Sequence, residues 1–346
     1  MPTPCGMTCR QLVTPLRILL RELCPFTEAA VPGGRTFSSG VGHPPTASPL
    51  HGTRSIVKLK GADTWRFLQG LVTNDVNKLR DAEGCSIMYT AILNPQGRCL
   101  YDLLLHKQSD PASVWLDVEK AKAAEIVTFL QRYKLRSKVD LLNVSDSYTV
   151  WAGLSGSLPT SEGWVTDPRL PDLGQRVILP ADHQPDGTPV PDEVYTERRF
   201  RLGVAEGSSE IPSGAALPLE YNLDALNGVS FSKGCYVGQE LTARTHFQGV
   251  IRKRLMPLRL LGGAGSPVKA GDKVTIHSGG SRSVGTVNAV LSDGSALGLM
   301  RLEAVGRALA GEVQLVAGDG GGVTPVVPGW WPPEWMDLAA EAPSAE

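Results

Sequence analysis

The order of its predicted elements indicates an α+β fold with a small antiparallel β-barrel at the C-terminal end. Between residues 51 and 250, strand-like and helix-like segments follow one another without the regular alternation that builds a parallel sheet. After residue 250, five short β runs are separated by glycine-rich turns at near-regular spacing, which is typical of a small barrel. A chain of 346 residues is long enough for two or three such compact parts.

The first part is predicted to begin near His51 with an alternating strand and a short helix. Asp63 precedes Trp65, Phe67 and Leu68 and is a suitable N-cap for that helix. Two strand-like runs follow, and the Asn-Pro-Gln-Gly link between them has turn composition, so they are predicted to form a hairpin. The predicted strands of this part are 55–60, 85–93, 98–106, 114–118, 139–144 and 148–151.

The strongest helix prediction covers residues 120–134, where apolar side chains such as Ala123, Ile126 and Leu130 recur along one side. Residues 154–196 are rich in proline, glycine and aspartate, which predicts loops, with a surface loop at 180–191. A short strand at 176–179, helices at 193–202 and 237–247, and barrel strands at 254–261, 273–277, 284–291, 296–302 and 312–317 complete the prediction.

The two ends of the chain are predicted to lie outside the folded parts. Residues 1–50 hold four arginines and two glutamates, and four leucines between residues 16 and 23 recur at helical spacing. An amphipathic, acid-poor segment followed by a serine-, glycine- and proline-rich stretch predicts a mitochondrial transit peptide and a flexible linker. The alternative is an ordinary disordered tail. Residues 336–346 are also predicted to be disordered.

Overall charge and hydropathy exclude two classes of partner. A formal net charge of −1 gives no reason to expect binding to nucleic acid. No apolar run approaches the roughly 18 residues that span a bilayer, so no membrane-spanning segment is expected. Arg252, Lys253 and Arg254 form a local basic run, for which a solvated face and a docking site for an acidic partner are both open. The tryptophans around residue 330 are expected to dock on the body or on a partner.

The cysteines argue against a self-contained metal site. Six are present, three of them within residues 1–50, and no CxxC pair occurs among Cys85, Cys99 and Cys235. Cys85 and Cys99 fall in the predicted hairpin strands and are expected to pack in a core, although an approach across the hairpin is the alternative. An iron–sulfur cluster bound here would therefore need ligands from a partner protein.

Cys235 has the surroundings of a functional thiol. It lies in the segment Lys-Gly-Cys-Tyr-Val-Gly-Gln-Glu, where flanking glycines let another molecule approach closely. A neighbouring lysine and a following helix N-terminus both favour the thiolate. The alternative is a buried structural cysteine. The residues expected to support Cys235 in this motif are Lys233, Gly234, Tyr236, Gly238, Gln239 and Glu240; for Lys233 and Glu240 a mutual ion pair is also open.

The motif also resembles a known signature. The pattern KGCYxGQE, preceded by NGVSFSKGC and followed by LTARTHFQGVIRKRL, resembles the YgfZ branch of the GcvT-like, folate-binding family. Within that branch it is most similar to the mitochondrial iron–sulfur cluster assembly factors. The likeness covers residues 53–331, since further matching segments follow in the same order: RFLQGLVTNDV, LNPQGRCLYDLLLH, YKLRSKV, LPLEYNLDALNGVSF and a Trp-Trp-Pro tail.

This resemblance implies a three-part ring of two mixed α+β domains and the C-terminal barrel around a central channel. Residues 51–250 would form the α+β region and residues 251–335 the barrel with its tail. In the aminomethyltransferase relatives the channel holds tetrahydrofolate beside an acidic pair. Tyr101-Asp102 stands at that place here, so one of the two acidic positions is replaced, which argues against one-carbon transfer. A tetrahydrofolate-dependent one-carbon transferase is the alternative function. Asp102 would act as base or anchor, or hold only a structural hydrogen bond. Basic residues expected at the channel are Arg136, Lys138 and Arg244, for which ordinary solvation at the surface is the alternative.

For the cluster-assembly branch, the resemblance implies a factor of the mitochondrial matrix that works with A-type iron–sulfur carrier proteins in maturing 4Fe–4S proteins. The family's motif cysteine corresponds to Cys235, which would be the metal ligand in a transient cluster shared with the carrier. The chain is then expected to be a monomer or one half of a heterodimer, and a non-catalytic or weakly catalytic factor. A third hypothesis, a thiol-redox enzyme, is weakened because no second cysteine lies near Cys235 in sequence.

Overall fold

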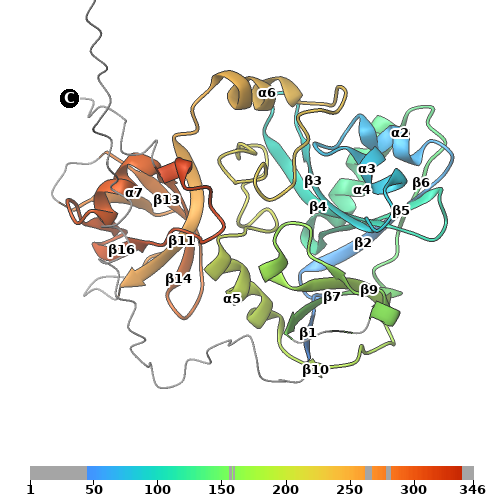
Figure 1. Ribbon diagram of the computed structural model, residues 1–346, viewed down its shortest axis with the longest axis horizontal. Helices are drawn as coiled ribbons and strands as arrows, with labels where there is room; N and C mark the ends of the chain where they lie inside the picture. The colour runs from blue at the N-terminus through green and yellow to red at the C-terminus, as the bar shows by residue number, and fades with distance from the viewer. Residues whose placement is uncertain (1–44, 156–157, 159, 262–266, 278–281, 337–346) are drawn as a thin grey trace, which may run out of the picture. The chain divides into compact units, whose positions relative to one another are not determined.

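The computed structural model describes residues 45–155, 158, 160–261, 267–277 and 282–336. Its strands form two five-stranded sheets and one closed barrel (Figure 1). The strand orders are β3-β4-β5-β2-β6 and β10-β1-β7-β9-β8 in the sheets and β11-β14-β13-β12-β15-β16 in the barrel. The predicted α+β class with a C-terminal antiparallel barrel is therefore confirmed.

The first sheet carries helices on one face and is antiparallel throughout. Apolar residues of β4 and β5, such as Leu103 and Leu116, pack there with Leu68, Leu79 and Ile126 of the covering helices. The hairpin prediction is confirmed, because β3 and β4 pair from one end to the other. The elements are β2 Arg54–Lys60, α2 Thr64–Gln69, α3 Val76–Asp81, β3 Ile87–Leu93, β4 Cys99–Lys107, β5 Ser113–Glu119, η1 Lys120–Lys122, α4 Ala123–Lys134 and β6 Asp140–Asn143.

The second sheet begins earlier than the sequence suggested. Residues 46–49 were expected to be part of a flexible stretch, but they form strand β1, which pairs with β7 and β10. Ala47 and Ser48 are fully buried there, so the folded part starts before His51. The elements are β1 Thr46–Pro49, β7 Tyr148–Ser155, η2 Thr160–Glu162, β8 Val165–Thr166, η3 Pro171–Leu173, β9 Gln175–Pro180, β10 Thr188–Pro189 and α5 Asp192–Leu202.

Helix α6 leads into the barrel, and all barrel pairings are antiparallel (Figure 1). The five predicted strands are present, and the structure adds a sixth, β16, and a helix, α7, that packs beside β14 and β16. The elements are α6 Gln239–Gln248, β11 Lys253–Leu261, β12 Lys273–Ile276, β13 Gly285–Val290, β14 Ser295–Arg301, α7 Leu302–Leu309, β15 Leu315–Ala317 and β16 Gly321–Pro325.

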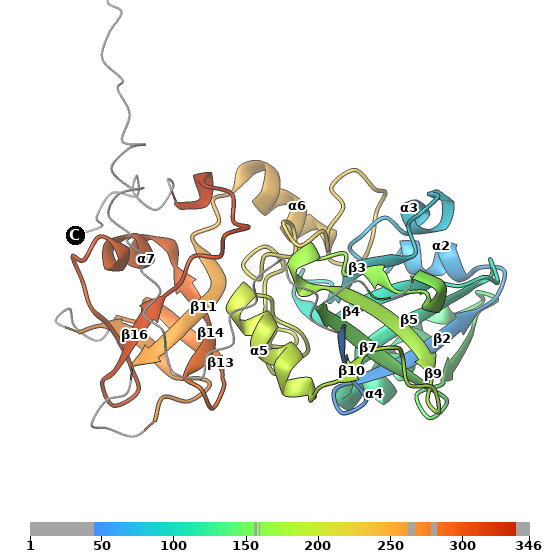
Figure 2. The same cartoon turned by 60° about the horizontal axis from the view of Figure 1, so that its bottom comes forward.

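One hydrophobic core connects the sheets and the barrel. Tyr89 and Leu104 of the hairpin pack in it with Phe200 at the end of α5 and with Leu255 and Leu297 of the barrel. Helix α5 contacts β1 as well as β11 and β14, and Figure 2 shows it beside the barrel strands. The tryptophan tail docks as expected: Trp331 is buried, and the indole N–H of Trp330 donates to the carbonyl of Leu202 at 2.7 Å.

The predictions for the two chain ends fall on residues 1–44 and 337–346, which lie outside the described part of the structure. Among the helices that the structure describes, none combines the length and apolar character needed to cross a membrane.

Candidate functional site

The three described cysteines all have free thiols: Cys235 is exposed at the surface, whereas Cys99 is buried and Cys85 is half-buried. Cys85 packs against the helix-covered core of the first sheet, and Cys99 is buried in the core that joins sheet and barrel. Burial raises the pKa of the Cys99 thiol well above its ordinary value. The two thiols therefore pack as predicted, at opposite ends of the hairpin and in different cores, away from mutual contact.

The loop that carries Cys235 is fixed on its N-terminal side by Lys233. The ammonium group donates three hydrogen bonds of 2.7–2.8 Å to the backbone carbonyls of Gln69, Val72 and Asn74. It also lies 4.9 Å from the ring centroid of Tyr236. Burial lowers its pKa to about 8. Since a lysine has three N–H donors, all of them are used, and none remains for the sulfur of Cys235. Lys233 anchors the loop instead of activating the thiol.

Backbone contacts extend this anchor along the same segment. The amide of Ser230 donates to the carbonyl of Thr73, and the amide of Val237 donates to the carbonyl of Gly70. The Val237 side chain packs on the core beneath, and Tyr236 packs on the core shared with the barrel. Burial raises the pKa of Tyr236 to about 12. The chain is thus tied down before and after Cys235, which leaves the cysteine on the outer side of a fixed loop.

Two glycines join this loop to the hairpin turn. Gly238, the N-cap of α6, has φ +80°, and a Cβ there would lie 2.3 Å from the carbonyl oxygen of Asn94. Gly97 in the turn has φ +78°, and its Cβ would lie 3.0 Å from the carbonyl oxygen of Gly238. Both positions therefore require glycine, through backbone conformation and through close packing. The side chain of Gln239 closes the turn by accepting a hydrogen bond from the amide of Tyr236 at 3.1 Å.

The outer side of the motif is open. A Cβ on Gly234 would meet nothing within 4 Å. Glu240 is exposed on the first turn of α6, and the mutual ion pair considered for Glu240 and Lys233 is absent from the described contacts. Helix α6 begins at Gln239, two residues later than predicted, so Cys235 precedes the N-cap Gly238 by three residues.

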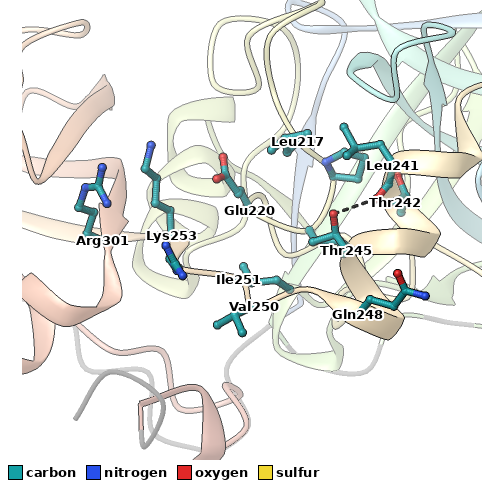
Figure 3. Close-up of a pocket in the computed structure, with 13 residues that line it drawn as sticks. Leu217, Glu220, Leu241, Thr242, Thr245, Gln248, Val250, Ile251, Lys253 and Arg301 are labelled. Atoms are coloured by element: carbon teal, nitrogen blue, oxygen red, sulfur yellow. Dashed lines mark hydrogen bonds between the residues drawn. The ribbon is translucent and has the colours of Figure 1, made fainter. Parts of the chain in front are cut away.

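A hollow of about 520 Å³ lies along the other side of α6 (Figure 3). Leu241, Thr242 and Thr245 of the helix line one wall. Val250 and the basic residues Arg252 and Lys253 that follow the helix continue this wall. Glu220 faces the hollow, and burial raises its pKa against the opposing effects of Lys253, Arg98 and Arg301. The hydroxyl of Thr242 is buried without a hydrogen-bond partner among the described residues. The hollow thus combines an apolar wall with an excess of basic side chains.

Asp102 lies inside the protein. Its carboxylate is 4% exposed and accepts a hydrogen bond from the amide of Gly207 at 3.0 Å. Burial raises its pKa to about 6, although Arg54 acts in the opposite direction. Its strand neighbour Tyr101 points to the other face of β4, where its hydroxyl donates to Glu125 at 2.7 Å. The structural hydrogen bond considered for Asp102 is therefore present, while its second carboxylate oxygen is buried without a partner among the described residues, and its role in tetrahydrofolate chemistry stays a prediction.

The other residues predicted at a folate channel lie apart from Asp102. Arg136 and Lys138 are exposed on the link between α4 and β6, and Arg244 is exposed on α6. The backbone amide of Lys138 donates to the carboxylate of Asp63 at 2.8 Å, which fixes this link near the start of α2. No described ion pair or hydrogen bond joins the four side chains to one another.

Sequence reasoning missed a buried ionic cluster around Asp102. Arg176 of β9 donates to Asp117 of β5 at 2.7 Å and to the hydroxyl of Tyr195 of α5 at 2.7 Å. Burial disfavours the charge of Asp117, yet Arg176 and Arg54 outweigh it and hold its pKa well below the usual range. In the sequence, the only sign of this cluster is that single charged residues occur within otherwise apolar strands. The cluster comprises Arg54, Asp102, His106, Asp117, Asp167, Arg169, Arg176, Tyr195, Arg199, Glu206 and Glu210.

Comparison with known proteins supports the architecture. Residues 252–333 match the family described as CAF17, C-terminal beta-barrel domain. A crystal structure of glycine cleavage system aminomethyltransferase T from Bartonella henselae aligns with a TM-score of 0.59 over 83% of this chain and 86% of that chain, at 14% sequence identity. At this identity the likeness shows the fold alone: the chain has the fold of that aminomethyltransferase, with a C-terminal β-barrel.

Two relatives narrow this fold class to a family. The mitochondrial iron-sulfur cluster assembly factor IBA57 of Mus musculus is 37% identical over 307 residues, which are 81% of this chain and 84% of that protein. The IBA57 homolog of Mycosarcoma maydis is 43% identical over 221 residues, which are 59% of this chain and 55% of that protein. The match thus spans about half the length of the fungal relative. The chain belongs to the family of the IBA57 iron–sulfur cluster assembly factors.

Proposed function

We propose that this chain is a mitochondrial assembly factor for iron–sulfur proteins, and that Cys235 supplies one ligand to a cluster shared with an A-type carrier protein. The observation that carries the proposal is the placement of Cys235. It is exposed on a loop that Lys233, Val237 and Gly238 fix from both sides. The relatives' names, which include "mitochondrial" and "iron-sulfur cluster assembly factor", support the location and the process.

The reaction proposed at Cys235 is an exchange of ligands on iron. The Cys235 thiol loses its proton, the sulfur forms a bond to iron, and a thiolate of the carrier that leaves the iron takes up the proton. No electron transfer is needed for this step. The anchored backbone lowers its entropic cost, since the loop is already held in one conformation. The open space beside Gly234 lets the carrier's backbone approach the sulfur closely.

The proposal is tested by mixing the full chain, without oxygen, with an A-type carrier loaded with a 2Fe–2S cluster. Visible absorption follows the cluster, and native mass spectrometry follows the complex. We expect a cluster-bound heterocomplex that Cys235→Ser abolishes or makes labile to oxygen. Cys85→Ser is the matched control, because Cys85 is half-buried against the core of the first sheet, and it should behave like the wild type. The proposal is wrong if Cys235→Ser supports the same complex and the same maturation of a 4Fe–4S client.

A further inference from the structure

We infer that the hollow beside α6 is a binding site for a small organic anion, which carries a carboxylate or a phosphate on an apolar body. Lys253 and Arg301 hold the anionic group, and the apolar wall of the hollow covers the rest of the ligand. The inference goes beyond the proposed function, because Cys235 does not line the hollow and no cluster is needed for binding there.

Two basic side chains that line the hollow lie directly opposite each other in the barrel. Lys253 of β11 pairs with Arg301 of β14 in antiparallel register. The amide of Arg301 donates to the carbonyl of Val284, so Lys253 and Arg301 form a non-hydrogen-bonded pair, with Cα atoms about 4.5 Å apart. Like charges in this position destabilise the two strands. Neither side chain forms an ion pair within the described ranges, and a bound anion supplies the missing partner.

The hollow as a whole has an excess of positive charge. Arg252 also lines it, so three basic side chains stand against one carboxyl group, that of Glu220. Burial raises the pKa of Glu220, although Lys253, Arg98 and Arg301 act in the opposite direction. A carboxyl group that keeps its proton more readily repels an anion less, and its O–H can donate a hydrogen bond to it. The net charge of the lining therefore favours an anion.

The rest of the hollow suits an apolar body. Figure 3 shows Lys253 and Arg301 on one side of the hollow and Leu241 of α6 on the other. Leu217 and Ile251 add apolar surface to the lining. The volume of about 520 Å³ lies in the usual range of small-molecule sites, about 300–1,000 Å³. The ligand is therefore larger than a simple inorganic anion.

The wall also contains an unused hydrogen-bonding group. Thr242 lines the hollow and is 2% exposed, and its hydroxyl has no hydrogen-bond partner among the described residues. Buried polar groups of folded proteins are nearly always hydrogen-bonded. A mostly apolar wall with a few polar groups is the usual composition of a small-molecule site.

The test titrates the full chain with four small probes and follows its amide signals by NMR. Phenylacetate and phenyl phosphate carry an anionic group on a ring, whereas 2-phenylethanol lacks the charge and inorganic phosphate lacks the ring. We expect one of the ring-bearing anions to shift the signals of Thr242, Thr245 and Arg301 with a millimolar dissociation constant, at least about tenfold tighter than 2-phenylethanol and inorganic phosphate. The tighter of the two identifies the anionic group. The inference is wrong if 2-phenylethanol or inorganic phosphate binds as tightly, or if neither ring-bearing anion saturates these signals.

Lys253→Gln combined with Arg301→Gln removes both charges and should weaken binding of the tighter probe at least about tenfold. Because a like-charge pair is also removed, this variant should melt no lower than the wild type, which separates lost binding from lost folding. Arg259→Gln combined with Lys269→Gln is the matched control, since both side chains are exposed and neither lines the hollow. Wild-type affinity in the variant of Lys253 and Arg301 would overturn the inference.

Glu220→Gln tests the sign of the ligand's charge. A neutral amide donates a hydrogen bond where a carboxylate repels an anion, so we expect the affinity at about pH 7.5 to rise about threefold. A gain in affinity cannot result from a damaged fold. If this substitution weakens binding instead, the group beside Lys253 and Arg301 is not an anion and the inference fails, while the proposed function stands.

Discussion

Gly238 has a backbone conformation and surroundings that other residues do not tolerate. Its φ of +80° costs about 1–2 kcal/mol for an L-residue with a side chain, and a Cβ would overlap with the carbonyl of Asn94. We predict that Gly238→Ala lowers the free energy of unfolding by about 2–4 kcal/mol. Gly234→Ala is the matched control, because its Cβ meets nothing within 4 Å, and should change stability by less than about 0.5 kcal/mol. Urea unfolding measures both, and equal losses would contradict this account.

Asp102 should give the stability a distinct pH dependence. Its pKa in the folded state is raised to about 6, mainly by burial, so the folded protein holds this proton at a pH where the unfolded chain has released it. The contribution of Asp102 is therefore most favourable below about pH 4 and falls as pH rises to 6. In Asp102→Asn this loss is absent. The wild type should lose about 2–3 kcal/mol relative to the variant between pH 4 and pH 7. Parallel stability curves across this window would refute the assignment.

At the scale of elements, the cysteine loop depends on Lys233. We predict that Lys233→Met leaves three backbone carbonyls without their donor and lowers the free energy of unfolding by about 2–4 kcal/mol. Hydrogen exchange of the Val237 amide should become faster, since its bond to Gly70 lies in the same anchor. Lys120→Met removes one exposed hydrogen bond to the carbonyl of His51 and should have a much smaller effect. Unchanged exchange at Val237 in the Lys233 variant would mean that the loop is held by other contacts.

Elements with strong local patterns could be predicted from the sequence. Ala123, Ile126 and Leu130 mark α4 by their spacing, and the Asn-Pro-Gln-Gly turn marks the β3–β4 hairpin. The motif also argued against a buried structural cysteine, because glycines and lysine around one thiol are unusual for such a residue, and Cys235 is exposed. For α4 and for the hairpin turn, the interactions that form the element join residues that are near one another in the chain.

Elements that depend on distant partners were missed. Strand β16 contains two glycines and a proline and resembles a turn, yet Gly322 packs close to Leu261 of β11, where a larger residue would crowd. Strand β1 pairs with β7, which follows about 100 residues later. The acceptors of Lys233 lie more than 150 residues away, so the sequence placed the lysine beside the cysteine without showing that its donors are already used.

At the scale of the molecule, the buried ionic cluster ties the two sheets to α5. Arg176 is 0% exposed and bonds to both Asp117 and Tyr195. We predict that Arg176→Met lowers the free energy of unfolding by about 3–5 kcal/mol, because it leaves buried carboxylates with fewer partners. Arg80→Met is the control: its partner Asp81 is exposed, and its loss should leave stability unchanged within error. Thermal unfolding followed by circular dichroism checks both, and similar melting temperatures for the two variants would rule out a stabilising role for the cluster.

The central claim is that Cys235 binds iron directly in a cluster shared with a carrier protein. X-ray absorption at the selenium edge tests it, with selenium in place of the sulfur of Cys235 in the full chain and an A-type carrier that holds the 2Fe–2S cluster. The account predicts an iron atom at bonding distance from selenium in the complex and none in the chain alone. A complex with an intact cluster in which selenium has only its carbon neighbour would contradict it.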